Sequence, residues 1–442
     1  MLSPPKKHLS FGSLRKIFSN TILPVQDKRD PTHCNYSVHD TASSGLAMMY
    51  FRDPSLLAFQ KRLQNVLQSN NLRTLFDVKA IASDTQIREI IDPIPWKTFR
   101  PVFTEYFSAL QRAKYLESFQ LLNGAYLCSL DGSEYFHSSA ISCPSCLIRN
   151  EGKKGEYFCH QILQATIVHP DKAQVIPLCP EPISNTDGKE KQDCEMNAAK
   201  RLLKKLRKEH PFLNLIINGD GLYSKQPLIE LILLLEMHFI LVAKPTDHTI
   251  LFEWFFEQKK LKETGKREWV DNKGRLHRYE WLNEIPLNGK DYLVNFFMYQ
   301  LIVDEKVTYQ NSWVTDFKVV QENVIELTKA GRARWKIENE CFNTLKNQGY
   351  HLEHNFGHGK ENLSFNFFLL NLIAFFMHQI FELTDKLYQK ARAYCGSKQS
   401  LWENIRVAIR FFVYDTWEHL LSHSVWPQEH PPPALFLAPR PP

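Results

Sequence analysis

The stretch of sequence that decides the fold is Leu215-Ile216-Ile217-Asn218-Gly219-Asp220, a short apolar run that ends on an aspartate. A run of this length and composition is typical of a strand buried on both faces of a sheet. The earlier run Tyr126-Leu127-Cys128-Ser129-Leu130-Asp131 has the same form. Because functional groups of open α/β sheets collect at the carboxyl ends of the strands, we expect Asp131 and Asp220 to lie together.

The pattern around these two runs predicts an α/β core. Three strands come first, and helices then alternate with strands. The expected elements are strands at about 125–131, 156–168 and 173–178, a basic helix at about 192–209, a strand at 213–219, a helix at 226–236 and a strand at 239–244. This order of strands and helices predicts an RNase H-like core.

A third acidic residue stands far downstream, in Arg334-Trp335-Lys336-Ile337-Glu338-Asn339-Glu340. The stretch has an amphipathic pattern typical of a helix. Glu338 and Glu340 would point about 200° away from each other on a helix, so one alone can face a given site. Two strand-end aspartates and one helical glutamate can converge on a pair of Mg²⁺ or Mn²⁺ ions, and such a pair promotes in-line attack on phosphodiesters.

These residues resemble the DDE transposases of bacterial insertion sequences, in particular the IS-four-like group with an Arg-Trp-x-Ile-Glu signature at the third acid. The signature here consists of Arg334, Trp335, Ile337 and Glu338. The resemblance covers nearly the whole chain. Further segments that resemble this group are Arg29–Tyr36, Phe51–Leu57, Lys191–Glu195 and Gly349–Asn355.

The resemblance implies an RNase H-like catalytic core that cleaves DNA at the terminal inverted repeats of an insertion sequence and transfers the strands to target DNA. It implies that Asp131, Asp220 and Glu338, rather than Glu340, are the catalytic residues and hold Mg²⁺. It also implies a homodimer or larger assembly on DNA and a phosphate contact for Arg334. The residues alone leave a second role open for Arg334, which is an ion pair with Glu338 one helical turn away.

Two positions depart from the pattern of the family. A tyrosine is expected three residues before the signature arginine and a lysine seven residues after the glutamate, whereas the chain has Gly331 and Leu345 there. Lys346 and Arg332 lie close by in the sequence and join Arg334 as candidate DNA-binding residues. Since the phosphate-binding part of the signature is altered, the residues leave open whether cleavage passes through a hairpin intermediate or another pathway.

Two other functions agree with the same residues. One is a metal-dependent nuclease with this core and no strand transfer, and the other is a catalytically idle DNA-binding protein derived from a transposase. The presence of all three acids argues against the idle protein. The long interval between Asp220 and Glu338 and the extent of the resemblance favour a transposase over a nuclease.

Composition and periodicity divide the chain into five regions. Helical spacing of apolar residues indicates a helical, DNA-binding N-terminal region, in which residues 1–30 are expected to form a loosely held arm. Aromatic-rich alternating segments and the hairpin-like Asp271-Asn272-Lys273-Gly274 indicate a mainly β insertion domain. The regions are 1–120 (helical), 121–245 (first part of the RNase H-like core), 246–318 (insertion domain), 319–424 (second part of the core, with C-terminal helices at 361–392 and 398–421) and 425–442 (a proline-rich tail).

Net charge and cysteine content indicate which partners and which cellular compartment suit the protein. The 442 residues carry a net charge of +6, which suits a polyanionic partner without requiring one. The start of the chain lacks the apolar segment of a secretory signal, so the nine cysteines are expected to be free or metal-bound in a prokaryotic cytoplasm, with the protein on the nucleoid when DNA is bound. Leu363–Phe381 is apolar enough to span a membrane, but its asparagines and histidine favour a buried core helix, and no membrane partner is expected.

A zinc site is a further hypothesis. Cys143-Pro144-Ser145-Cys146 has CxxC spacing, and Cys159 and His160 follow. These four residues could form a tetrahedral Zn²⁺ site, whereas the alternative is a set of reduced cysteines in a β-hairpin. Other histidines are weaker candidates as ligands: His137, His169, His351, His354 and His358. The last three, which follow Glu338 in the sequence, could instead touch DNA or shape the acidic site.

Two more features have a structural and a DNA-binding interpretation. The basic helix around Lys200–Lys208 is expected to pack its leucines on the core, and contact with a DNA backbone is the alternative. The tryptophans of the insertion domain are expected mainly in the core, and one of them could stack on a flipped base; they are Trp254, Trp269, Trp281 and Trp313.

Overall fold

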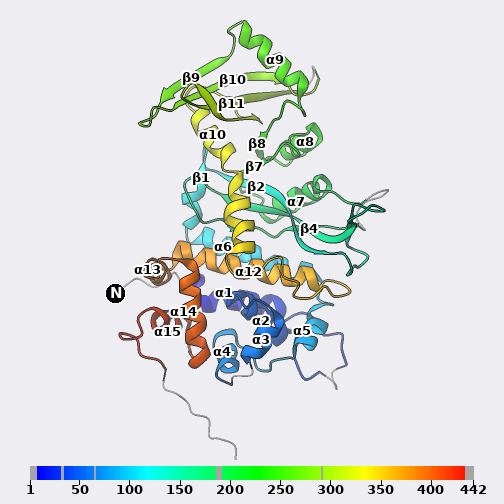
Figure 1. Cartoon of the computed structure of the whole chain (residues 1–442), viewed down its shortest axis with the longest axis vertical. Helices are drawn as coiled ribbons and strands as arrows, with labels where there is room; N and C mark the ends of the chain where they lie inside the picture. Colours follow the sequence, from blue (N-terminus) through cyan, green and yellow to red (C-terminus); the bar gives the residue numbers. More distant parts are fainter. Residues whose placement is uncertain (1–6, 31–33, 64–65, 186–191, 290–291, 434–442) are drawn as a thin grey trace, which may run out of the picture. The chain divides into compact units, whose positions relative to one another are not determined.

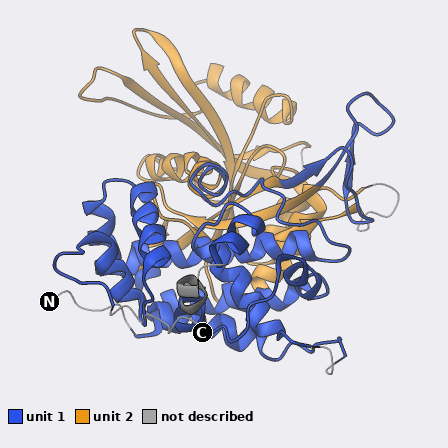
Figure 2. Ribbon diagram, turned by 60° about the horizontal axis from the view of Figure 1, so that its bottom comes forward, with its two compact units in different colours: residues 1–116, 135–159, 342–442 blue, residues 117–134, 160–341 orange. Residues whose placement is uncertain are grey.

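The computed structural model describes residues 7–30, 34–63, 66–185, 192–289 and 292–433 (Figure 1). Residues 31–33, Lys191 and the last part of the proline-rich tail therefore lie outside the described residues. The chain divides into two compact units, coloured separately in Figure 2. Unit 1 comprises 1–116, 135–159 and 342–442, and unit 2 comprises 117–134 and 160–341. Helices and a mixed sheet occur together, so the predicted α/β class is confirmed.

Unit 1 is mainly helical. Its N-terminal helices are α1 (Phe11–Ile22), α2 (Val38–Tyr50), α3 (Leu56–Leu63), α4 (Val66–Phe76), α5 (Asp84–Ile91) and α6 (Arg100–Arg112). Its later helices are α11 (Asn343–Asn347), α12 (Leu363–Thr384), α13 (Lys386–Tyr394), α14 (Lys398–Phe411) and α15 (Trp417–Val425). The predicted helices at 361–392 and 398–421 are thus each two helices, because Asp385 caps α13 and Thr416 caps α15 with their side chains.

The long apolar helix α12 forms the centre of unit 1, where it packs against α2, α5 and α6. It is long and apolar enough to cross a membrane, but 89% of its most apolar window is buried inside the protein. Its polar side chains are satisfied within the fold: Asn366 donates to the carbonyls of Ile91 and Ile94, and Asn371 donates to the carbonyl of Tyr350. The prediction of a buried core helix is confirmed, since a lipid-facing helix would leave these amides without partners.

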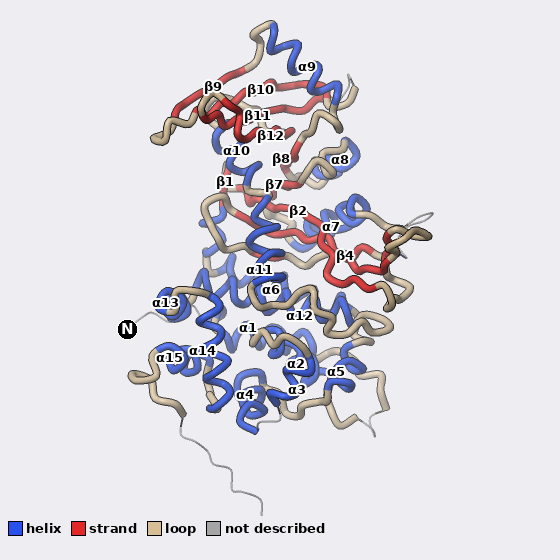
Figure 3. Tube along the Cα trace, viewed as in Figure 1, coloured by secondary structure: helices blue, strands red, loops and turns tan. Residues whose placement is uncertain are grey.

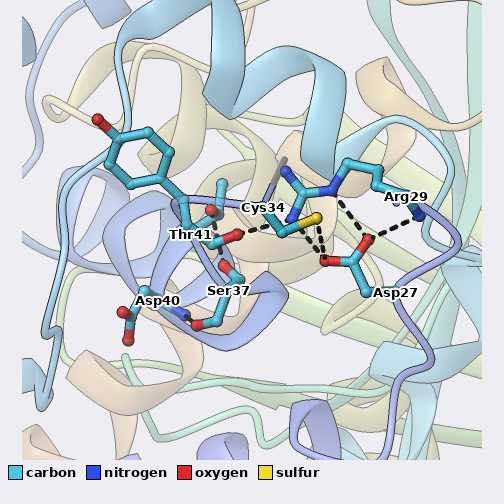
Figure 4. A network of polar contacts seen from close by, with 7 residues as sticks. Asp27, Arg29, Cys34, Ser37, Asp40 and Thr41 are labelled. Atoms are coloured by element: carbon cyan, nitrogen blue, oxygen red, sulfur yellow. Dashed lines mark hydrogen bonds and ion pairs between the residues drawn. The ribbon is translucent and has the colours of Figure 1, made fainter. Parts of the chain in front are cut away.

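The predicted loose arm at the N-terminus is wrong for the described part. Residues 11–22 form helix α1, and its apolar side chains Leu14, Phe18 and Ile22 are buried. The loop that follows is held by polar contacts (Figure 4). Arg29 binds the Asp27 carboxylate at 2.8 Å through Nε and donates to the carbonyl of Tyr36 at 2.7 Å.

Helix α2 begins directly after this loop, with Ser37 as its N-cap. The Ser37 hydroxyl accepts from the backbone N–H of Asp40 at 2.9 Å, and Thr41 donates to the Ser37 carbonyl (Figure 4). Together with the contact between Arg29 and the Tyr36 carbonyl, these hydrogen bonds hold the backbone at the start of α2.

The end of the chain is partly packed. The side chain of His423 contacts the carbonyl of His430 at 2.8 Å, and that of His419 contacts the carbonyl of Pro431 at 3.0 Å. The first part of the proline-rich tail is therefore held by contacts with α15, and residues 434–442 are not described.

The sheet of unit 2 is built around parallel strands β2 (Ala125–Ser138), β7 (Leu215–Gly219) and β8 (His238–Val242), shown among the red strands in Figure 3. Strand β4 (Tyr157–Val168) lies beside β2, and short strands β5 (Ile176–Pro177) and β6 (Glu181–Ile183) pair with β4. Among the described strands the order is β4-β2-β7-β8 at the centre, with β1 (Gln120–Leu121) on β2 and β3 (Leu147–Arg149) on β4.

Helices α7 (Glu195–Glu209) and α8 (Gln226–Leu234) connect the strands of this sheet. The leucines of α7 are buried, as expected for a helix packed on the core. Two of its cations are used inside the protein: Arg201 and Lys205 bind the Glu181 carboxylate at 3.0 and 2.5 Å. These contacts favour the structural interpretation of the basic helix.

The segment after β8 extends the same sheet. It consists of α9 (Thr249–Lys260), β9 (Gly265–Val270), β10 (Leu276–Pro286), β11 (Leu293–Val303) and β12 (Lys306–Thr315). Strand β12 pairs antiparallel with β8, Trp313 opposite Val242, and the strand order continues β12-β11-β10-β9. The predicted hairpin at Asp271–Gly274 joins β9 to β10, with Gly274 at a φ of +74°.

Candidate active site

Asp131 and Asp220 lie at the same level of two neighbouring parallel strands. Strand β2 pairs with β7 in a register that sets Ser129 opposite Asn218, and each aspartate stands two residues further along its strand. Adjacent strands are about 4.8 Å apart, so this register brings the two carboxylates together. The Asp131 carboxylate accepts from the N–H of Gly132 at 3.0 Å, and that of Asp220 accepts from the N–H of Leu222 at 2.9 Å.

Glu338 belongs to a helical segment that follows α10 (Val324–Arg332). The α-helix breaks at 333–334 and resumes with a π-helix, Ile337–Phe342. Arg334 Nη1 binds Glu338 Oε1 at 2.8 Å and lies 4.0 Å from Asp131 Oδ2. Arg334 thus links the acidic residue of the helix to the aspartate of β2, and the predicted ion pair between Arg334 and Glu338 is present.

Helix α10 is fixed on the sheet by Asn218 and by a close approach at Gly331. The Asn218 side chain, two residues before Asp220, donates to the carbonyl of Ala330 at 2.8 Å. A Cβ at Gly331 would lie 2.6 Å from Nε1 of the buried Trp313. The indole occupies the space that a side chain at position 331 would need, so the tyrosine expected there from the resemblance would not fit.

The site concentrates negative charge. Burial, which is the largest cause, and the charges of Glu338, Glu195 and Asp220 together raise the pKa of Asp131 to about 7, against the opposing charge of Arg334. Burial lowers the pKa of Arg334, but the hydrogen bond to Glu338 and the charges of Glu338, Asp131 and Asp220 together outweigh it, so the pKa of the guanidinium is raised. One cation is therefore shared by several carboxylates, which is an environment that favours a divalent metal ion.

Glu195 is a member of this acidic group that the sequence did not single out. It begins α7, and its carboxylate accepts from Gln161 Nε2 at 2.8 Å and from the Tyr223 hydroxyl at 3.0 Å. It also lies against the backbone of Gly132, where a Cβ would be 2.4 Å from Glu195 Oε1. An acid in the first turn is common in any helix, so only the fold reveals that this one faces Asp131.

Other predicted site residues lie elsewhere. The Arg332 guanidinium stacks on Tyr309 and Tyr299, 4.8 and 5.3 Å from the ring centroids. Lys346, in unit 1, forms an ion pair with Glu353 at 3.0 Å. Both side chains already have protein partners, so their proposed contacts with DNA remain predictions.

Glu338 and Glu340 differ in their surroundings. The side chain of Glu338 is 51% exposed and carries the contact with Arg334, whereas Glu340 is half-buried. The electrostatic effect of Glu338 on Asp131 makes Glu338 the acid that belongs with the two aspartates.

The predicted metal-binding cysteines are only partly brought together. Within the described residues, Cys143, Cys146, His160 and His358 offer ligand atoms within 4.8 Å of one another. Cys159 is not part of this group, and the prediction was wrong for it. Consecutive side chains of a strand point to opposite faces, so Cys159 and His160 on β4 cannot both face one ion.

The tryptophans of the insertion segment are divided between core and surface. Trp313 is fully buried and Trp281 is nearly so, while Trp254 and Trp269 are 44% and 41% exposed. Trp269 stacks on His277 at 4.2 Å, which leaves Trp254 as the more available ring.

Comparison of the sequence with protein-family models gave no match, and comparison with curated proteins gave none. Arguments about function therefore rest on the residues and their geometry.

Proposed function

We propose that the protein is a DDE-type DNA transposase with an RNase H-like core, which cleaves and joins DNA strands at the terminal inverted repeats of an insertion sequence. The observation that carries the proposal is the meeting of Asp131 and Asp220 on adjacent parallel strands, with Glu338 linked to Asp131 through Arg334. The arrangement of the strands across the sheet supports such a core. Strand β4, with its short partners, lies on one side of β2, and the parallel strands β7 and β8 follow on the other side.

The donor set fits Mg²⁺ or Mn²⁺. Asp131, Asp220 and Glu338 supply the carboxylate oxygens that such ions prefer, and Glu195 adjoins them. The raised pKa of Asp131, which burial and the neighbouring acids cause, indicates uncompensated negative charge at the same point. When bound, the ions would polarise the scissile phosphate and activate the attacking oxygen.

The protein's own residues would prepare the site for these ions and for DNA. Tyr223 and Gln161 hold Glu195 in place by hydrogen bonds. Arg334 keeps Glu338 beside Asp131 before metal binding. Once metal neutralises the acids, its guanidinium becomes free to bind a DNA phosphate. We propose that this chemistry takes place in a dimer or larger assembly, in the cytoplasm and on the nucleoid.

A strand-transfer assay tests the proposal. The substrate is a DNA fragment that carries the flanks of the coding region, incubated with a supercoiled target plasmid and Mg²⁺. A transposase gives cleavage at the ends and joined products in the plasmid. Cleavage without joined products would indicate the nuclease, and binding without cleavage would indicate the idle DNA-binding protein, so either result would reject the proposal.

A further inference from the structure

A second group of metal-ligand side chains belongs to unit 1. Cys143 and Cys146 lie in the segment between β2 and β3, and His358 lies in the loop before α12. The two sulfur atoms are 3.7 Å apart, and Cys146 Sγ lies 3.4 Å from His358 Nε2. Although 212 positions separate Cys146 from His358, the fold brings them together.

The spacing of these atoms is that of a tetrahedral zinc site. With Zn–S bonds of about 2.3 Å and Zn–N bonds of about 2.0–2.1 Å, tetrahedral geometry sets two sulfurs about 3.8 Å apart and a sulfur and a nitrogen about 3.5 Å apart. The observed separations of 3.7 and 3.4 Å agree with both values. An ordinary contact between a thiol and an imidazole does not require this agreement.

The ligands are held in position without an ion. His358 Nδ1 lies 3.1 Å from the carbonyl of Gly359, a contact that assigns the proton to Nδ1 and leaves Nε2 as the ligand atom. The Asp92 carboxylate fixes the chain directly after it by accepting from the backbone N–H groups of Lys360, Glu361, Asn362 and Leu363. The Phe136 ring packs on the imidazole with centroids 4.6 Å apart.

The turn between the cysteines is fixed in the same way. The N–H of Cys146 donates to the carbonyl of Cys143 at 3.0 Å, and the N–H of Cys143 donates to Cys146 Sγ at 3.4 Å. Cys146 is 2% exposed. Cys143 is half-buried, and the two thiols beside an imidazole nitrogen form a soft ligand set, which selects zinc over magnesium.

We propose that Cys143, Cys146 and His358, which all belong to unit 1, bind a structural Zn²⁺ ion. Binding releases the two thiol protons to solvent, and a ligand set of two thiolates and an imidazole is typical of zinc rather than magnesium. The ion would fasten the Cys143–Cys146 turn to the loop that leads into α12.

Metal analysis of the purified full-length protein tests this site. We expect about one Zn²⁺ per chain after removal of loosely bound metal, and less than about 0.2 in Cys143→Ser, Cys146→Ser and His358→Ala. Cys395→Ser, which removes a half-exposed thiol from unit 1, is the matched control and should keep its zinc. Zinc retained in the variants of Cys143 and Cys146 would overturn the proposal.

A cobalt titration avoids reliance on the folding of variants. Chelator-treated wild-type protein should bind Co²⁺ with the absorption bands of a tetrahedral ion and a thiolate charge-transfer band. Absence of these bands, or a disulfide between Cys143 and Cys146 in freshly purified protein, would contradict the site. Cys159→Ser, which removes a unit 1 thiol outside the proposed ligand set, should leave cobalt binding unchanged, and loss of the bands in that variant would contradict the ligand assignment.

Discussion

Asp131 is the titrating residue of the acidic site. Its pKa of about 7 in the folded chain exceeds the ordinary value of 3.8, chiefly because the carboxyl is buried. Between these values the folded state keeps a proton that the unfolded state has lost, so the stability of the metal-free protein should fall as pH rises from about 4 to about 7. Urea unfolding of the wild type and Asp131→Asn across this window measures the effect, and parallel pH dependences would contradict it.

The same proton competes with metal. Mn²⁺ affinity should rise with pH by up to about tenfold per unit and level off above about pH 7, because the carboxylate must be ionised to bind. Titration of the wild type with Mn²⁺ at several pH values gives this profile, and an affinity that is flat between pH 5 and 7 would argue against Asp131 as a ligand.

Arg334 either contacts a DNA phosphate or only pairs with Glu338, and the substitution Arg334→Ala distinguishes these two roles. If Arg334 binds a phosphate of DNA, Arg334→Ala should lower the slope of log affinity against log salt by about one unit. Lys260→Ala is the control, since it removes an exposed cation of unit 2 that pairs with Glu257. Binding is measured with metal withheld to prevent cleavage, and an unchanged slope in Arg334→Ala would leave the ion pair with Glu338 as its role.

Glu195 is expected to support the metal site. Glu195→Gln keeps the size of the side chain and removes its charge, so we expect Mn²⁺ affinity to fall by about tenfold with little change in stability. Glu209→Gln, at the opposite end of α7, is the control. Equal metal affinity in the two variants would mean that Glu195 serves only to anchor Tyr223 and Gln161.

At the scale of elements, the packing of α10 decides where Glu338 lies. Gly331→Val would push a side chain into Trp313, whose indole nitrogen is 2.6 Å from an ideal Cβ. We expect a loss of about 1–3 kcal/mol in stability and weaker metal binding, because α10 and the segment behind it would shift. Gly12→Ala, in an open position of α1, should have no such effect. Normal metal binding in Gly331→Val would show that α10 does not position the site.

The sequence predicts the elements of the core better than the partners of individual residues. Apolar runs identify β2 and β7, because burial imposes a pattern on neighbouring residues. Asp220 directly follows β7 as predicted, whereas β2 continues to Ser138, so the predicted strand end at Asp131 was wrong. Glu195 was not predicted as a site residue and His358 was only a weaker candidate as a ligand, since nothing near them in the sequence indicates what they face. Cys159 was included as a ligand because it adjoins His160 in the sequence. In a strand, however, adjacent side chains point to opposite faces, so the two residues do not face the same ion.

At the scale of the whole molecule, the two units are not consecutive along the chain. Unit 1 is assembled from three separate segments, and strands β2 and β4 each begin in one unit and end in the other. Boundaries drawn from composition follow the order of residues, so they cannot anticipate such a division. The structure contains the expected helices in 1–120 and the expected strands in 246–318. That each of these regions forms a separate domain remains a prediction.

The most direct test of the proposed function is the effect of Asp220→Asn on DNA. The substitution removes one metal-ligand charge and leaves the side chain similar in size, and it touches none of the residues proposed to bind phosphate. With Mg²⁺ and DNA that carries the element's ends, we expect strand cleavage to fall at least about 100-fold. Binding in a gel-shift assay with Ca²⁺ should stay within about threefold of the wild type. Cleavage that persists in Asp220→Asn, or a loss of binding equal to the loss of cleavage, would contradict the assignment of Asp131, Asp220 and Glu338 as the catalytic site of a transposase.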